Sequence, residues 1–137
     1  MANYHLVILK KQYLDKILDG SKTIESRLTK GKCPPFDCVS PGDVLFFKES
    51  AGMVVAKAQA ATVKQFSELT PQAIAKLKTE YNARIGGDDE YWQLKADSKY
   101  ATLIKLKNVE TIPPRRIYKK DWRAWVVLKK PNDFGLL

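Results

Sequence analysis

The segment GSKTIESRL, residues 20–28, brings together a lysine, a glutamate, an arginine and three hydroxyl side chains. Residues 23–29 alternate as a half-buried strand does, which predicts that Thr23, Glu25 and Arg27 share one face. Ile24, Ser26 and Leu28 then face the other way, with the two aliphatic side chains on the core. A carboxylate between a lysine and an arginine is expected to stay ionised. The segment therefore predicts a pre-organised charged site.

Two kinds of chemistry suit such a site. In a binding site, Glu25 would read a base edge or a hydroxyl, and Arg27 or Lys22 would meet a phosphate. In a hydrolytic site, Glu25 would act as general base to a water and Lys22 would stabilise an oxyanion, with Thr23 as the neighbouring hydroxyl. The alternative is a surface ladder of ion pairs, which would contribute only about 0–1 kcal/mol.

Further side chains are candidates for ligand contacts. Lys48 and Ser50 share a face at the end of an apolar strand, where one anion could meet both. Tyr91, Trp92 and Tyr100 could stack on an unpaired base, although a tryptophan on a short helix is also a common core residue. The predicted substrate-binding set is Arg27, Lys48, Ser50, Trp92, Tyr100, Arg115 and Arg116.

The charge of the chain favours a polyanionic partner. The 137 residues carry a formal net charge of +9, from 24 Lys and Arg against 15 Asp and Glu. From Lys99 to Leu137 there are ten basic residues and three acidic ones, so the excess is concentrated in the last part of the chain. A clustered excess of this kind indicates a basic face, and RNA or a nucleotide is the expected ligand.

Cysteine and histidine usage argues against a metal site. Cys33 and Cys38 are the only cysteines and His5 is the only histidine, too few for a structural zinc site. Two reduced thiols in a cytoplasmic loop are the better interpretation, and His5 is predicted to be structural. No cofactor is expected. No apolar run approaches 18 residues and the first residues are charged too early for a signal peptide, so we expect a cytoplasmic protein without membrane contact.

The periodicity of the chain predicts the elements that position these groups. A helix should end at Gly20, and a second should begin after Thr70 with Pro71 in its first turn and close at Gly86 or Gly87. A long Pro- and Gly-containing loop at 29–43 connects two of the strands, and a basic segment at 113–121 connects two others. Strands are predicted at 4–9, 23–29, 43–50, 53–63, 100–112 and 123–130, and a short helix at 88–97.

The order of these elements predicts the fold class. Strands and helices do not alternate regularly, which argues against a doubly wound parallel sheet. We therefore predict one α+β domain over residues 1–137, a small, mostly antiparallel β-barrel flanked by helices.

The opening of the chain resembles that of an ASCH domain, a branch of the PUA-like superfamily. The resemblance is carried by a strand, a helix with "IL" and a glycine, and then Lys22, Thr23, Glu25 and Arg27 on the next strand. It extends over nearly the whole chain through three later segments, "PGDVLFFKES", "YATLIKLKNVE" and "AWVVL". The resemblance implies a small barrel with a cleft lined by these charged residues, and binding of RNA or nucleotides.

Some ASCH proteins are similar to enzymes, which gives an alternative. One bacterial branch hydrolyses N4-acetylcytidine, and another is reported to cut single-stranded RNA. In the amidohydrolase branch a lysine works with a threonine three positions later; Lys22 matches the lysine, but Glu25 stands where the threonine nucleophile would be. The sequence therefore favours an RNA- or nucleotide-binding domain, with a metal-free hydrolase acting on single-stranded RNA or on an N4-acylated cytidine as the alternative.

Overall fold

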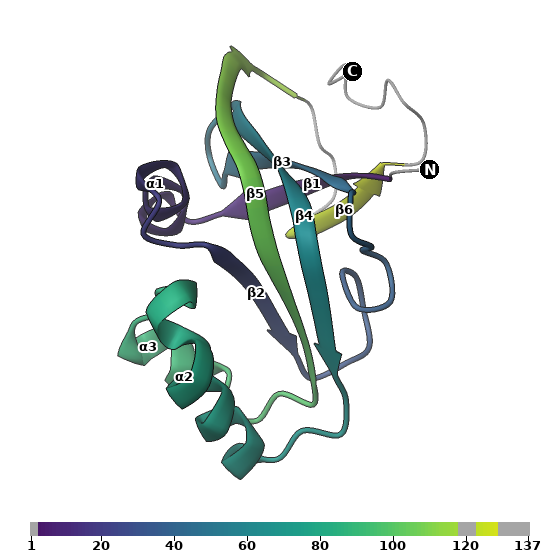
Figure 1. Ribbon diagram of the computed structural model, residues 1–137, viewed down its shortest axis with the longest axis vertical. Coiled ribbons are helices and arrows are strands. Elements are labelled where there is room, and N and C mark those ends of the chain that lie inside the picture. Colours follow the sequence, from purple (N-terminus) through teal and green to yellow (C-terminus); the bar gives the residue numbers. More distant parts are fainter. Residues whose placement is uncertain (1–2, 118–122, 129–137) are drawn as a thin grey trace.

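A six-stranded mixed sheet, curled into a half-barrel, organises the part of the chain that the structure describes (Figure 1). This computed structural model describes residues 3–117 and 123–128. The elements follow in the order β1 (Tyr4–Leu9), α1 (Lys11–Asp19), β2 (Ile24–Thr29), β3 (Val44–Glu49), β4 (Val54–Phe66), α2 (Pro71–Ile85), α3 (Asp89–Leu94), β5 (Tyr100–Arg115) and β6 (Trp125–Leu128).

The strand order in the sheet is β2-β5-β4-β3-β1-β6, and all neighbours except one pair are antiparallel. The prediction of a small α+β barrel flanked by helices is confirmed. The exception is β1, which runs parallel to β3 from Tyr4 opposite Val44 to Leu9 opposite Glu49. Parallel neighbours need a long crossover, and here α1 and β2 provide it. The strand β2 pairs only with β5, so it forms one edge of the sheet.

The predicted helix ends are confirmed by their capping geometry. Gly20 ends α1 with φ of 85°, a left-handed conformation that glycine adopts without steric cost. The Thr70 hydroxyl accepts a hydrogen bond from the Ala73 backbone N–H at 3.2 Å and caps α2, with Pro71 in the first turn. Asp88 caps α3 in the same way, accepting from the Tyr91 N–H at 2.8 Å. These caps fix where each helix begins and ends around the candidate site.

The strand β5 is longer than predicted. It continues through Pro113 and Pro114 to Arg115, whereas the sequence predicted that a connecting segment begins at these prolines. The register explains the difference: Thr111 lies opposite Ala56 and Arg115 opposite Val54, so β5 has a bulge where the prolines stand. A bulge tolerates residues that cannot donate to the ladder.

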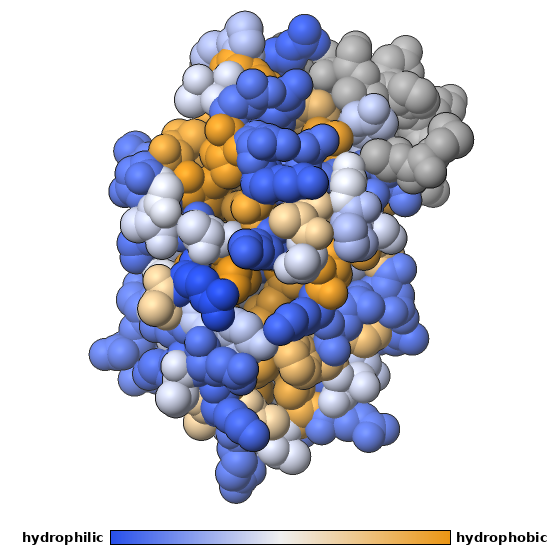
Figure 2. All heavy atoms as spheres, in the orientation of Figure 1, coloured by the Kyte–Doolittle hydropathy of each residue, from blue (hydrophilic) through white to orange (hydrophobic). Residues whose placement is uncertain are grey.

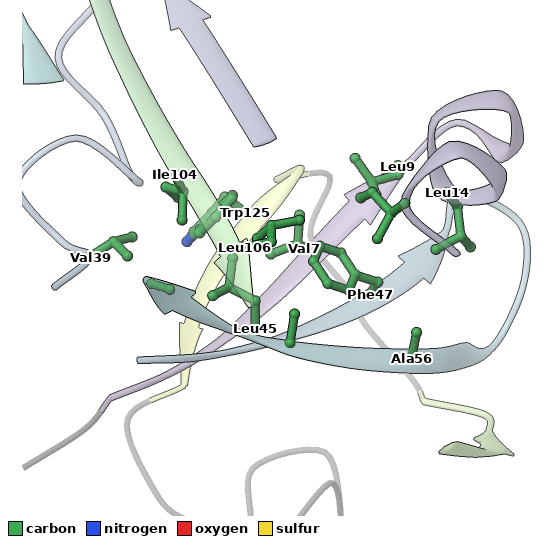
Figure 3. Close-up of a cluster of buried hydrophobic side chains, with 13 residues drawn as sticks. Val7, Leu9, Leu14, Val39, Leu45, Phe47, Ala56, Ile104, Leu106 and Trp125 are labelled. Atoms are coloured by element: carbon green, nitrogen blue, oxygen red, sulfur yellow. The ribbon is translucent and has the colours of Figure 1, made fainter. Parts of the chain in front are cut away.

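The main core fills the inside of the curl. Figure 3 shows Val7, Leu45, Phe47 and Leu106 pointing into this space, and α1 adds Leu14 at one end. Several of these side chains are fully buried, which makes this cluster the rigid support of the sheet. In the view of Figure 2, hydrophilic side chains and patches of exposed apolar side chains share the face on which β4 and β5 lie.

A second core lies between α2, α3 and the strands β2 and β5. Ile24 and Leu28 face this cluster, as the alternation predicted. Trp92 is also part of it: its side chain is buried, and its indole N–H donates to the Asn82 side-chain oxygen at 2.9 Å. Trp92 is therefore a core residue rather than an exposed stacking surface.

A buried polar chain joins β1 to β6. The Trp125 indole N–H donates to His5 Nδ1 at 3.1 Å, which leaves His5 Nε2 to donate to the Asp43 carboxylate at 2.9 Å. All three residues are buried, so the prediction that His5 is structural agrees with its surroundings. Lys119, Lys120, Lys129 and Lys130 of the basic C-terminal part lie outside the described residues.

Candidate functional site

A cavity of about 210 Å³ opens at the free edge of β2. It lies where this edge faces the end of β1, the start of α1 and the connection from α2 to α3. Because the cavity lies beside the free edge of β2, side chains from both faces of this strand reach it: Glu25 and Arg27 from one face and Ser26 from the other. The cavity is lined by Ile8, Leu9, Lys10, Tyr13, Lys22, Glu25, Ser26, Arg27, Ile85, Gly87, Asp88, Glu90, Tyr91, Leu94 and Lys95.

The three charged residues of the opening segment meet in this cavity. Glu25 Oε1 lies 3.6 Å from Lys22 Nζ, and Glu25 Oε2 lies 3.4 Å from Arg27 Nη2. The Lys22 and Glu25 side chains are each 3% exposed, and that of Arg27 is 17% exposed. The carboxylate thus stands between two cations with little water around it, where charge interactions are stronger than at the surface.

Lys22 is held deep in the cavity wall by two backbone carbonyls. Its ammonium donates to Ile24 O at 2.8 Å and to Ile85 O at 2.7 Å, which ties β2 to the end of α2. Two of its three N–H donors are used in this way, and the third is left for Glu25 or for a ligand. Burial lowers the pKa of Lys22 from its ordinary value, and the nearby Glu25 carboxylate partly opposes this effect. A buried amine with a lowered pKa is a recurrent feature of functional sites.

Arg27 connects β2 to β1 across the opening of the half-barrel. Its Nη2 donates to Ile8 O at 2.9 Å, and the guanidinium carbon lies 5.4 Å from the centre of the Trp125 ring. Trp125 is itself fixed by the hydrogen bond to His5. The guanidinium is therefore held by a carbonyl, a carboxylate and an indole face, while part of it remains exposed to the cavity.

Ser26 lines the cavity, although alternation predicted that it faces away from the site. Its hydroxyl lies 2.7 Å from the Tyr91 hydroxyl, which reaches it from α3. The prediction was wrong because β2 is an edge strand: the side of the sheet that carries Ser26 meets α3 at the rim of the same cavity. Burial raises the pKa of Tyr91, so this phenol remains protonated at neutral pH.

Two tyrosine rings form an aromatic wall. The rings of Tyr13 and Tyr91 meet edge to face with centroids 6.0 Å apart, and Lys22 Nζ lies 5.7 Å from the centre of the Tyr13 ring. The Tyr13 hydroxyl donates to Asp88 at 3.4 Å, which joins α1 to the start of α3. Burial raises the pKa of Tyr13 as well. The wall offers an apolar surface beside the charged group.

Several predicted site residues lie outside the cavity. The Thr23 N–H donates to Arg84 O of α2 at 2.9 Å, and the Thr23 carbonyl accepts from the Leu106 N–H of β5 at 2.9 Å. The Thr23 side chain is not part of the lining. The Lys48 ammonium donates to the carbonyls of Glu49 and Ser50 at a turn, and the Ser50 hydroxyl lies 3.4 Å from Leu9 O. The structure does not bring these side chains to the Lys22 group.

The aromatic and C-terminal candidates are also elsewhere. The Tyr100 ring packs on Phe36 with centroids 5.1 Å apart. Arg115 ends β5 opposite Val54, and Arg116 is exposed beyond it. Of the predicted substrate-binding set, only Arg27 lines the cavity.

The residues of the lining that were not predicted there include Lys10, Tyr13, Ser26 and Lys95. Tyr13 precedes Ile17 by four residues, so the helical stripe could have placed it on the buried face of α1. Tyr91 was one of three aromatic candidates, and of these three it is the one that lines the cavity. Lys10 and Lys95 carried no pattern that distinguishes them from surface lysines.

Metal ligands and membrane spans were also sought in the described ranges. Within residues 3–117 and 123–128, no group of three or more His, Cys, Asp or Glu side chains is arranged to hold a metal ion. In the same ranges, none of the helices has the length and apolar character needed to cross a membrane. Cys33 and Cys38 are free thiols, and neither lines the cavity.

Comparison with solved structures identifies the architecture. The structure of ASCH from Zymomonas mobilis superposes with a TM-score of 0.73 over 95% of this chain and 90% of that chain, at 13% sequence identity. The chain has the ASCH fold. Two variants of the same Zymomonas mobilis protein give TM-scores of 0.71: a tyrosine-to-phenylalanine variant at 14% identity, covering 93% and 91% of the two chains, and a serine-to-alanine variant at 16%, covering 93% and 89%.

The resemblance to an ASCH domain that the sequence indicated is thus confirmed for the fold. No family model matches the chain. No curated protein matches it either. At such identities the shared property is the fold, so the functional argument depends on the residues in the cavity.

Proposed function

We propose that this protein binds RNA or a nucleotide and holds one nucleoside in the cavity at the edge of β2. The observation that carries the proposal is the convergence of Lys22, Glu25 and Arg27, with contacts of 3.4–3.6 Å, inside a cavity of about 210 Å³. A nucleobase presents donors and acceptors side by side along one edge. A carboxylate between two cations offers the complementary pattern in a fixed geometry.

The aromatic wall supports a flat ligand. Tyr13 and Tyr91 line the cavity on the side of the helices, opposite the β2 edge. Stacking of a base on such a ring contributes about 1–3 kcal/mol and tolerates any base. The charged group would then add selectivity, because a base edge that cannot donate to Glu25 leaves this buried carboxylate with a less favourable partner.

The exposed basic residues support RNA as the source of the nucleotide. Lys105 and Lys107 are exposed on β5, and Arg115 and Arg116 follow at its end. These cations lie outside the cavity, and they would contact phosphates of a longer strand without reading its sequence. Affinity for single-stranded RNA would fall with salt by a slope of about −0.7 per phosphate contacted.

A hydrolase is the second candidate, because the same groups suit attack by water. Glu25 would accept a proton from a water molecule, and the oxygen of that water would attack a carbonyl or phosphorus centre. Lys22 and Arg27, each within 3.6 Å of Glu25, would stabilise the negative charge that develops. The Ser26 and Tyr91 hydroxyls, 2.7 Å apart in the same cavity, supply a group able to protonate the departing atom.

Binding is tested with two variants that keep the shape of the site. Lys22→Met and Glu25→Gln should each weaken binding of single-stranded RNA and of the four ribonucleoside 5′-monophosphates at least about tenfold, measured by fluorescence anisotropy and calorimetry. Thr23→Ala is the matched control, since Thr23 lies between Lys22 and the start of β2 and does not line the cavity. Circular dichroism spectra must show that each variant is folded. Unchanged affinity in both folded variants would remove the site assignment.

Turnover is tested separately. The protein is incubated with single-stranded RNA and with N4-acetylcytidine, and the products are separated by gel and by chromatography. Product formation that is lost in Glu25→Gln supports the hydrolase. Tight binding without product, in contrast, leaves the binding function alone.

A further inference from the structure

Three cations line the outer part of the same cavity: Lys10 at the start of α1, Arg27 on β2 and Lys95 at the end of α3. They come from three separate elements, so the fold and not a local sequence run brings them together. Lys10 is exposed, Lys95 is half-buried, and the Arg27 side chain is 17% exposed. We call this group the cationic mouth.

The cations of the mouth repel one another. The pKa of Lys95 is lowered first by burial and then by the nearby charges of Arg27 and Lys10. In the described part of the chain, neither Lys10 nor Lys95 forms an ion pair. Gathering like charges costs free energy unless an anion is bound between them.

The acidic residues that line the cavity form no ion pair with the two lysines of the mouth. Asp88 accepts hydrogen bonds from the Tyr91 N–H, the Tyr13 hydroxyl and the Gln12 amide, so its carboxylate is used to cap α3. Glu90 is exposed on the same helix and pairs with none of the three cations. Glu25 lies deeper, between Lys22 and Arg27. Glu25 pairs with Arg27, and the charge of Lys10 helps to lower the pKa of Asp88, so part of the positive charge is offset. Among the described residues, however, no carboxylate forms an ion pair with Lys10 or Lys95.

From this arrangement we infer that the cationic mouth is a phosphate subsite, which receives the phosphate of a nucleotide whose base lies deeper against Glu25 and the tyrosines. The inference rests on the proposed nucleotide-binding function and deepens it: the ligand is a nucleotide rather than a nucleoside. Arg27 belongs to both parts, since one Nη atom bonds to Ile8 O and Glu25 while the rest of the guanidinium lines the cavity. A guanidinium suits bidentate contact with phosphate oxygens.

Two phosphate chemistries fit the subsite, and ligands of one nucleoside series separate them. The probes are the four ribonucleosides, their 5′-monophosphates, the methyl esters of these monophosphates, and inorganic phosphate. A monophosphate carries a terminal dianion, whereas the methyl ester carries the single charge of a phosphodiester inside RNA. Preference for the monophosphate indicates a nucleotide or a strand end, and equal affinity for the ester indicates the interior of a strand.

The variants are Lys10→Gln, Lys95→Gln and their combination, with Lys76→Gln as the control. Within the described residues, the side chains of Lys10 and Lys95 donate no hydrogen bond, and Lys76 is exposed on α2 away from the cavity. In the wild type, calorimetry should show a phosphorylated probe binding at least about tenfold more tightly than its nucleoside, which corresponds to about 1.4 kcal/mol. The combined variant should reduce this ratio to about twofold or less, and Lys76→Gln should leave it unchanged.

Opposite results separate this inference from the proposed function. If nucleosides bind as tightly as both phosphorylated forms, or if the ratio persists in the combined variant, the subsite is refuted while nucleoside binding stands. If no nucleoside or nucleotide binds, but inorganic phosphate broadens its ³¹P resonance only when Lys10 and Lys95 are present, the subsite stands and the proposed function fails. If no probe binds at all, both are refuted.

Discussion

Replacing Glu25 by glutamine removes one negative charge from the cavity and keeps the shape of the side chain. The Glu25 carboxylate accepts the Ser26 backbone N–H at 2.9 Å, and the glutamine carbonyl can accept the same bond. The change therefore isolates the electrostatic role of the carboxylate toward Lys22 and Arg27. Both cations would then lack the counter-ion that lies 3.4–3.6 Å away in the wild type.

The expected cost follows from burial. Lys22 and Glu25 are each 3% exposed, so water cannot replace the lost partner. Breaking one buried pair by removing a partner costs about 3–5 kcal/mol, and we expect Glu25→Gln to lower the free energy of unfolding by this amount. If Lys22 is already methionine, only Arg27 is left without its carboxylate, and Arg27 keeps its bond to Ile8 O. The same Glu25→Gln change should then cost about 1–3 kcal/mol less.

Urea unfolding of the wild type, both single variants and the double variant measures this coupling directly. Lys22→Met is destabilising by itself, because the carbonyls of Ile24 and Ile85 each lose a donor. The informative quantity is thus the departure from additivity and not either single loss. Additivity within about 0.5 kcal/mol would show that the Lys22 and Glu25 charges do not interact, and the description of the cavity would have to be abandoned.

Three further changes test other parts of the structure. The pKa of Lys22 is lowered from 10.5 in the folded protein, so at pH values just below 10.5 the unfolded chain binds more protons than the folded one. The free energy of unfolding of the wild type, measured in urea, should therefore increase relative to that of Lys22→Met as the pH rises toward 10.5. Thr70→Ala should cost about 1 kcal/mol by loss of the helix cap, whereas Thr79→Ala inside the same helix should cost nothing in a parallel measurement. Gly87→Ala should destabilise the protein by about 1–3 kcal/mol and lower its thermal midpoint, because the new Cβ would lie 2.8 Å from Tyr91 and 2.9 Å from Trp92. Gly31→Ala should leave the thermal midpoint unchanged, because no atom lies within 4 Å of the position of its Cβ.

Local signals in the sequence predict the elements of this fold well. Gly20 and Thr70 stand at helix ends because their conformational and capping properties act within a few residues. The end of β5 is different. The prolines at 113 and 114 normally end a strand, and the bulge that accommodates them depends on the register with β4, far away in the sequence.

The candidate site shows the same division. Alternation along a strand is a local property, and it predicted that Glu25 and Arg27 share a face. In the structure Glu25 Oε2 lies 3.4 Å from Arg27 Nη2. Ser26 was misplaced because alternation does not reveal that β2 is an edge strand beside α3. Lys10 and Lys95 are 85 positions apart in numbering, so only the assembled fold brings them to one cavity. Groups that meet through tertiary packing leave no periodic signal to read.

The sheet is open between its edge strand β2 and the end that holds β1 and β6, and in the described part of the chain no backbone ladder joins β2 to β1. Arg27 bonds to Ile8 O across this gap. This is the seam at which local opening should cost least, and it coincides with the cavity. A ligand bound in this cavity would contact residues of both β1 and β2 and would stabilise the closed form of the seam. Occupancy should then raise the unfolding temperature in proportion to the logarithm of ligand concentration, so heating the protein with a library of small compounds offers a way to find what it holds.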